Sequence, residues 1–260
     1  MTTNHLILDF SHVYCDEKIP KNDKVHWMDC SDITECDLYC SKRAEEIRAR
    51  IAPYGIHGIH FWDSGNYHYV TGIMTEQIKQ GFSLILFDHH TDMQKPMIGH
   101  MTSCGDWAGK VLKTNPWLQQ LILIGPQERD IQQIYSEKEG LVTSTELREK
   151  LVTFSAEEIQ SGEAGNKISK IKKNFPVYIS IDKDILDEEY SETNWSQGKM
   201  SLPVLERLLM PFLKSGNILG IDICGECQQG MPLPQYLEAE EINGETNKEL
   251  FDFLMHYSHM

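Results

Sequence analysis

The stretch Leu84-Ile-Leu-Phe-Asp-His-His-Thr-Asp92 places four apolar residues directly before a group of acidic and histidine side chains. The apolar residues, 84 to 87, predict a short buried strand. Alternate side chains share one face of an extended chain, so Asp88, His90 and Asp92 are expected to point the same way. Two carboxylates and an imidazole at a strand's end are a common set of metal ligands. Polar residues also follow strands for solubility alone, and that alternative stands for this stretch taken by itself.

A second strand further along the chain also ends in acidic residues. The mainly apolar residues 175 to 181 are followed by Asp182 and Asp184, again two positions apart. Parallel strands bring their carboxyl ends to one edge of an α/β sheet, where such folds place their sites. A third apolar run, 56 to 62, precedes His68, which supplies a second imidazole unless it is an ordinary core histidine. Four carboxylates and two imidazoles exceed what one tetrahedral zinc needs and suit a pair of cations, with Mn²⁺ the natural candidate.

These motifs resemble the arginase (ureohydrolase) family of binuclear manganese hydrolases. The resemblance lies in His68, in the D-x-H-x-D of residues 88 to 92 and in the S-x-D-x-D-x-x-D of residues 180 to 187. It implies a single-domain, three-layer α/β/α fold with a mainly parallel sheet and a metal site at the carboxyl ends of the strands. The ligands that it implies for two Mn²⁺ ions are His68, Asp88, His90, Asp92, Asp182 and Asp184.

The resemblance also implies a reaction and the residues that take part in it. A hydroxide that bridges the two ions would attack the central carbon of a guanidino group and release urea and an amine. Asp92 is expected to hold this hydroxide, and His100 to protonate the leaving amine. His60 and His89 are alternatives to His100 as the proton carrier. An ordinary surface histidine without a catalytic role is an equally good interpretation of His100. Glu226 is expected to bind the guanidinium group.

Two of the departures from the family pattern concern residues that are expected to bind the substrate. Glu226 follows Asp222 by four residues where arginases have three, and Gly225 is expected to take up the extra residue as a bulge. Free-arginine enzymes have an asparagine two residues past the D-x-H-x-D motif, where this chain has Gln94. We therefore expect Glu226, Gln94 and Trp195 to bind agmatine, a guanidino acid or an arginine side chain within a peptide. A deacetylase-like zinc amidohydrolase and a non-catalytic binding protein with the arginase fold are the alternatives.

Composition limits the partners and the location. The chain has 260 residues, 40% hydrophobic and 24% charged, which suits one arginase-like domain over residues 1–260. A net charge of −15 argues against nucleic acid or an anionic membrane as a partner and agrees with a cationic substrate. A cytoplasmic location is expected, since neither a signal peptide nor an apolar run of ~18 residues is present. The sequence leaves open whether the chain forms a homo-oligomer.

The cysteines are expected to be reduced thiols. Their number, seven, is odd, which does not suit a disulfide framework in a chain of this length. Cys224 and Cys227 form a C-x-x-C without a second pair, which argues against a zinc or redox site. Cys36 and Cys40 lie one turn apart on a helix expected over residues 32–51. Further helices are expected over 69–79, 106–114, 202–213 and 237–256, and further strands over 6–10, 121–124, 151–154 and 218–223.

Overall fold

The computed structural model describes residues 3–14, 18–19, 22–99, 101–136, 140–163, 167 and 170–258. Its centre is an eight-stranded sheet in the order β2-β1-β4-β10-β9-β5-β7-β8, and all the pairings in it are parallel. The strands are β1 (His5–Asp9), β2 (Val25–Asp29), β4 (Ile59–Phe61), β5 (Phe82–Phe87), β7 (Leu118–Ile124), β8 (Leu151–Phe154), β9 (Val177–Asp182) and β10 (Ile218–Cys224). A separate antiparallel ribbon joins β3 (Tyr39–Cys40) and β6 (Thr102–Ser103).

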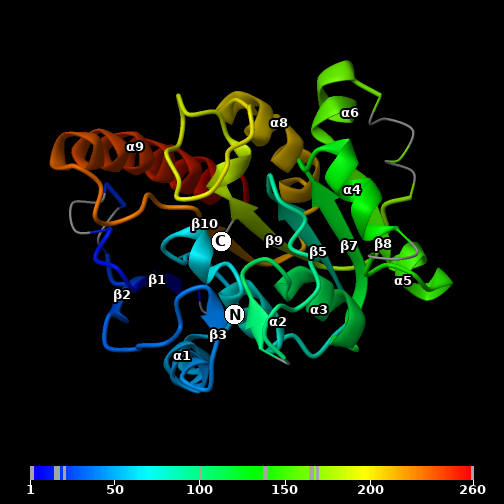
Figure 1. The fold of residues 1–260 in the computed structure, drawn as a ribbon, viewed down its shortest axis with the longest axis horizontal. Coiled ribbons are helices and arrows are strands. Elements are labelled where there is room, and N and C mark those ends of the chain that lie inside the picture. Colours follow the sequence, from blue (N-terminus) through cyan, green and yellow to red (C-terminus); the bar gives the residue numbers. More distant parts are fainter. Residues whose placement is uncertain are drawn as a thin grey trace.

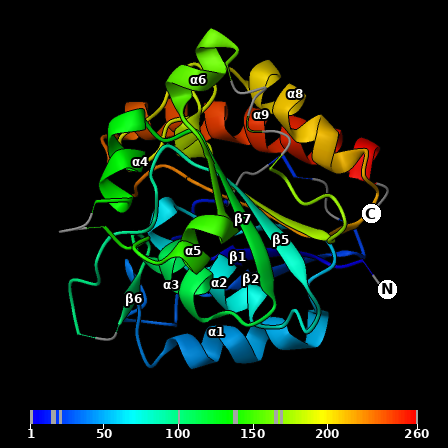
Figure 2. The ribbon, with the colours of Figure 1, turned by 90° about the vertical axis from the view of Figure 1, so that its right-hand side faces the viewer.

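Helices cover both faces of the sheet, so the molecule has three layers (Figures 1 and 2). The helices that pack on one face include α1 (Ala44–Ile51), α2 (Val70–Thr75) and α3 (Trp107–Thr114). Those on the other include α8 (Leu202–Leu213) and α9 (Leu233–Ser258). The segments around β8 form α4 (Glu128–Ile134), α5 (Thr145–Lys150) and α6 (Ala156–Ser161). The expected α/β/α fold with a mainly parallel sheet is confirmed.

The strands have apolar residues on both faces because helices cover both faces. Along β5, Leu84 and Leu86 pack in one core cluster while Ile85 and Phe87 pack in the other. All four side chains are fully buried. This two-sided burial explains why the run before Asp88 is continuously apolar instead of alternating with polar residues.

The largest difference from the expected elements lies before α1. The expected helix over residues 32–51 begins only at Ala44, and the preceding residues form turns and the short strand β3. Glu35 and Leu38 have positive φ angles of 63° and 65°, which a right-handed helix does not tolerate. Cys36 and Cys40 therefore do not share a helical face.

In the described ranges, no helix combines the length and apolar character that crossing a membrane requires.

Candidate metal centre

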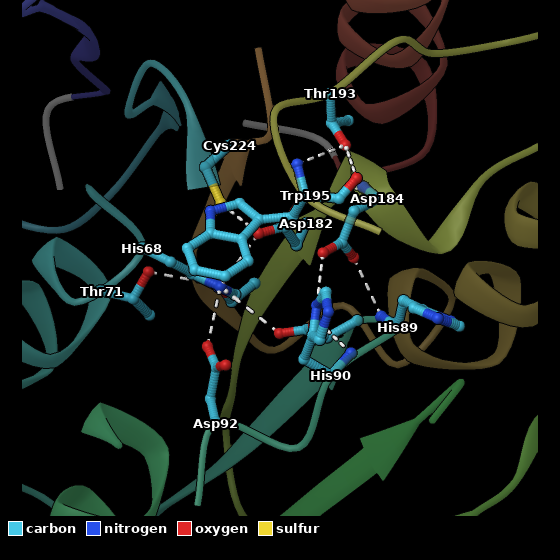
Figure 3. A network of polar contacts seen from close by, with 12 residues as sticks. His68, Thr71, His89, His90, Asp92, Asp182, Asp184, Thr193, Trp195 and Cys224 are labelled. Carbon is cyan, nitrogen blue, oxygen red and sulfur yellow. Dashed lines mark hydrogen bonds and ion pairs between the residues drawn. The ribbon is translucent and has the colours of Figure 1, made fainter. Parts of the chain in front are cut away.

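The acidic side chains meet at one edge of the sheet because three strands end there. Asp88 follows β5, Asp182 is the last residue of β9, and the loop after β4 leads through the 3-10 helix η2 (Gly65–Tyr67) to His68. The strand β9 lies between β5 and β10, with β4 on the far side of β10. Parallel pairing thus gathers segments that are far apart in the sequence (Figure 3).

The first group of candidate metal ligands surrounds His68. Its Nδ1 faces three carboxylate oxygens, at 3.4 Å for Asp88, 3.2 Å for Asp92 and 3.3 Å for Asp182. Ligand atoms that lie ~2.1 Å from one ion are about 3.0–3.4 Å apart. All four side chains are buried. The distance from His68 to each carboxylate therefore matches the distance between two ligands of one ion, and the ligand atoms of His68, Asp88 and Asp92 all lie within 4.8 Å of one another.

The second group lies beside the first and shares Asp88 with it. The Nδ1 of His90 is 2.7 Å from Asp184 Oδ2 and 3.6 Å from Asp88 Oδ1. Asp88 thus turns one oxygen to each group. Within the described residues its Oδ2 is buried and accepts no hydrogen bond. A buried carboxylate oxygen in this position fits a bound cation, since burial without a partner is unfavourable.

The charges of the cluster also fit a cation. Burial and the neighbouring carboxylates, Asp92 first, raise the pKa of Asp88 far above its usual range. Burial and the charge of Asp182 raise the pKa of Asp184 to about 6. Burial alone would lower the pKa of His90, but hydrogen bonds with Asp184 and Asp88 raise it to about 12. Each shift favours added positive charge in the cluster, which divalent ions would supply.

Residues 64–225, more than half of the chain, match the sequence model of the arginase family. The chain belongs to the arginase family. An uncharacterized protein of Thermotoga maritima is 29% identical over 265 residues, 96% of this chain and 91% of that protein. The agmatine ureohydrolase of Thermoplasma volcanium has a similar structure, with a TM-score of 0.63 and 13% identity over 99% of this chain and 91% of its own.

Trypanosoma cruzi formiminoglutamase with Mn²⁺ is also similar, with a TM-score of 0.65 and 12% identity, covering 98% of this chain and 94% of that one. At 13% and 12% identity, these two comparisons show that the proteins share a fold with this chain. The arginase-family membership foreseen from His68 and the two aspartate motifs is confirmed.

A hydrogen-bond relay orients His68 in this arginase-family chain. Its Nε2 lies 3.0 Å from Ser180 Oγ, and Ser180 donates to Asp222 Oδ1 at 2.6 Å. Thr71 Oγ1 donates to the same carboxylate oxygen at 3.0 Å. Outer partners of this kind fix the ring and leave the other nitrogen free for metal. No role was expected for Ser180 or Asp222, although alternation places Ser180 on the same strand face as Asp182.

The ligands converge through turns and not, as expected, through extended backbone. Asp92 has a φ of 48°, a left-handed conformation that bends the segment after β5. Its Oδ2 accepts a hydrogen bond of 2.6 Å from the indole nitrogen of Trp107. Asp184 lies in the 3-10 helix η3 (Lys183–Ile185), and its backbone N–H donates to Asp182 Oδ1 at 3.0 Å. Two tight turns, one after β5 and one after β9, therefore bring the carboxylates together.

A small cavity of about 150 Å³ opens next to both ligand groups. The expected substrate residues Gln94 and Trp195 both line it. Trp195 is 41% exposed, and its ring lies edge-on to that of His90, with centroids 5.9 Å apart. Its indole nitrogen donates to Asn66 Oδ1 at 2.9 Å. The other wall residues are Leu38, Tyr39, Gly65, Met97, Ser103, Cys104 and Gly105 beside the ligands Asp88, His90, Asp92, Asp182 and Asp184.

The structure places Glu226 beside Lys183 and not in the wall of the cavity, where the expected guanidinium contact would lie. Its Oε1 accepts hydrogen bonds from Lys183 Nζ at 2.5 Å and from Asn247 Nδ2 at 2.8 Å, and the side chain is buried. It does not line the described cavity wall. Gly225 adopts a φ of +99°, and a Cβ there would lie 2.6 Å from Asp182 Oδ1. Gly225 therefore has a backbone conformation that favours glycine, and the turn that it makes carries Glu226 to Lys183.

The expected proton carrier, His100, lies outside the described residues. Of its two alternatives, His60 is fully buried within β4, where its Nδ1 accepts a hydrogen bond from the Leu6 backbone N–H. His89 turns its ring away from the ligand cluster (Figure 3). Its backbone N–H instead donates to Asp184 Oδ1 at 3.0 Å. Neither alternative lines the cavity.

Proposed function

We propose that the chain is a hydrolase that uses two divalent metal ions to cleave a carbon–nitrogen bond of a guanidino or amidine compound. The observation that carries the proposal is Asp88, which turns one oxygen to each of two ligand groups. Membership of the arginase family supports it. The similarity to structures named agmatine ureohydrolase and formiminoglutamase agrees with this substrate class. We further propose that residues 1–260 form one enzyme domain and that it acts in the cytoplasm.

The residues present fit two Mn²⁺ ions. His68, Asp92 and Asp182 would hold one ion, His90 and Asp184 the other, and Asp88 would bind both. Most of these donors are carboxylate oxygens, which suit manganese. When bound, the ions would supply an activated water at neutral pH.

The remaining side chains would position the reacting groups. Trp107 fixes Asp92 through Oδ2, and we propose that Asp92 Oδ1 accepts a hydrogen bond from the attacking water. Gln94 and Trp195 would contact the part of the substrate that does not react. Among the described residues, the carboxylates of the cavity wall are the proposed ligands themselves. No further carboxylate of the described cavity wall would then be left to bind a second cationic group. This favours a guanidino acid or a peptide-borne arginine as the substrate. His100 remains our proposed proton donor to the leaving amine.

The proposal is tested by elemental analysis and a product screen. Protein loaded with Mn²⁺ should hold two ions per chain and release urea or ammonia from at least one guanidino or amidine compound. Asp184→Asn should keep the fold, lose metal and lose turnover, while His100→Ala should lose turnover and keep metal. One zinc and no manganese after growth with both would favour the deacetylase-like alternative. Two bound ions without any hydrolysis would favour the binding protein.

A further inference from the structure

A thiol lies at ligand distance from the first metal group. Cys224 ends β10 directly beside Asp182, with which it is paired in the register of β9 and β10. Residues paired in this way point to the same face of the sheet. The Sγ of Cys224 is 3.2 Å from Asp182 Oδ2, and the residue is fully buried. Figure 3 shows the sulfur directed towards the carboxylate and His68.

The spacing of these atoms matches that of ligands around one ion. His68, Asp182 and Cys224 each offer one ligand atom, and the three atoms lie within 4.8 Å of one another. A sulfur ~2.3 Å and an oxygen ~2.1 Å from the same ion are about 3.1–3.6 Å apart. The Sγ–Oδ2 distance falls in this range. The orphaned Oδ2 of Asp88 lies 3.4 Å from His68 Nδ1, in the adjoining group of His68, Asp88 and Asp92, and independently points to a cation beside His68.

We propose that Cys224 is a further ligand of the ion that His68 and Asp182 hold. The inference rests on the metal centre of the proposed function. A cation that binds there takes the place of the thiol proton, which leaves to solvent or buffer, so that a metal–sulfur bond replaces the S–H bond. Thiolate is a softer ligand than carboxylate. The two metal positions therefore differ: the one at Cys224 favours zinc or cobalt more strongly than the oxygen-rich one at His90 and Asp184.

The competing account is that the thiol only donates a hydrogen bond to Asp182. Cys224→Ser separates the two, since a hydroxyl keeps that hydrogen bond and removes the soft ligand. Cys227→Ser is the matched control, because Cys227 is also buried and three residues away but packs in the other core cluster.

The experiment strips the protein with a chelator and titrates it with Co²⁺. Wild type and Cys227→Ser should develop a thiolate-to-cobalt charge-transfer absorption in the near ultraviolet. Cys224→Ser should bind cobalt without this absorption, and its preference for Zn²⁺ over Mn²⁺ should fall at least tenfold. X-ray absorption on wild-type protein, which needs no variant, should detect one sulfur ~2.3 Å from cobalt.

Two bound ions without a sulfur signal would overturn the role of Cys224 and leave the proposed function intact. The same holds if the absorption survives in Cys224→Ser. Failure of wild type to bind any of the three metals would overturn both the inference and the metal-dependent function.

Discussion

Removing one partner of the buried pair Lys183–Glu226 should destabilise the protein strongly. The two side chains are 0% and 2% exposed, and their charged atoms lie 2.5 Å apart. Unit charges at that distance attract by about 7 kcal/mol at an effective dielectric constant of ~20. The cost of taking both charges out of water offsets much of this attraction. Loss of one partner nevertheless leaves the other charge buried and unpaired, which typically costs ~3–5 kcal/mol.

The assay is urea unfolding of Lys183→Met, of Glu226→Gln and of the double variant. Each single variant should lose ~3–5 kcal/mol. The double variant should lose less than the sum, because neither charge is then stranded. Lys248→Met is the control: Lys248 pairs with Asp252 at 2.7 Å, but both side chains are about half exposed, at 49% and 54%. Loss of this surface pair should therefore change the free energy of unfolding far less than loss of the buried pair.

A functional readout separates this role from substrate binding. If Glu226 serves only Lys183, folded Glu226→Gln should keep its metal and bind a guanidino substrate with a nearly unchanged KM. If instead Glu226→Gln leaves stability intact and abolishes turnover, the carboxylate acts on substrate and the structural reasoning is wrong.

Three further predictions concern the relay, the core and the cavity. Ser180→Ala removes the partner of His68 Nε2 and should weaken metal binding 10- to 100-fold in a calorimetric titration; wild-type affinity would exclude the relay. Burial lowers the pKa of His60 from 6.5 to about 3, so the folded state binds fewer protons than the unfolded state between these values. Stability should therefore fall by ~1.4 kcal/mol per unit as the pH drops below 6.5, and His60→Gln should unfold in urea with a shallower pH dependence than wild type. Trp195→Ala should raise KM at unchanged metal content; an unaltered KM would remove Trp195 from the substrate site.

Local patterns were sufficient to predict seven of the eight strands of the sheet but not β2 (Val25–Asp29), and the resemblance to the arginase family supplied the six proposed ligands. The apolar run before Asp88 predicts a strand because hydrophobic burial acts through neighbouring residues of the chain. The carboxylates were expected to converge because alternate side chains of an extended chain share one face, and this reason was wrong. Asp92 and Asp184 reach the centre through a left-handed residue and a 3-10 turn, and period-two alternation does not describe such turns. The irregular segment before α1 was missed for a similar reason, since positive φ angles at Glu35 and Leu38 end the helical pattern.

The sequence by itself determined the fold class, the family and the residue types at the strand ends, because burial and ligand chemistry depend on residue type and order. Only the tertiary structure decided which polar groups meet. Glu226 pairs with Lys183 and does not line the cavity, because the turn at Gly225 directs the Glu226 side chain towards Lys183. Cys224 faces Asp182 because β10 lies beside β9 in one particular register. Contacts between strands depend on register and turn geometry, which the spacing of residues along one chain does not specify.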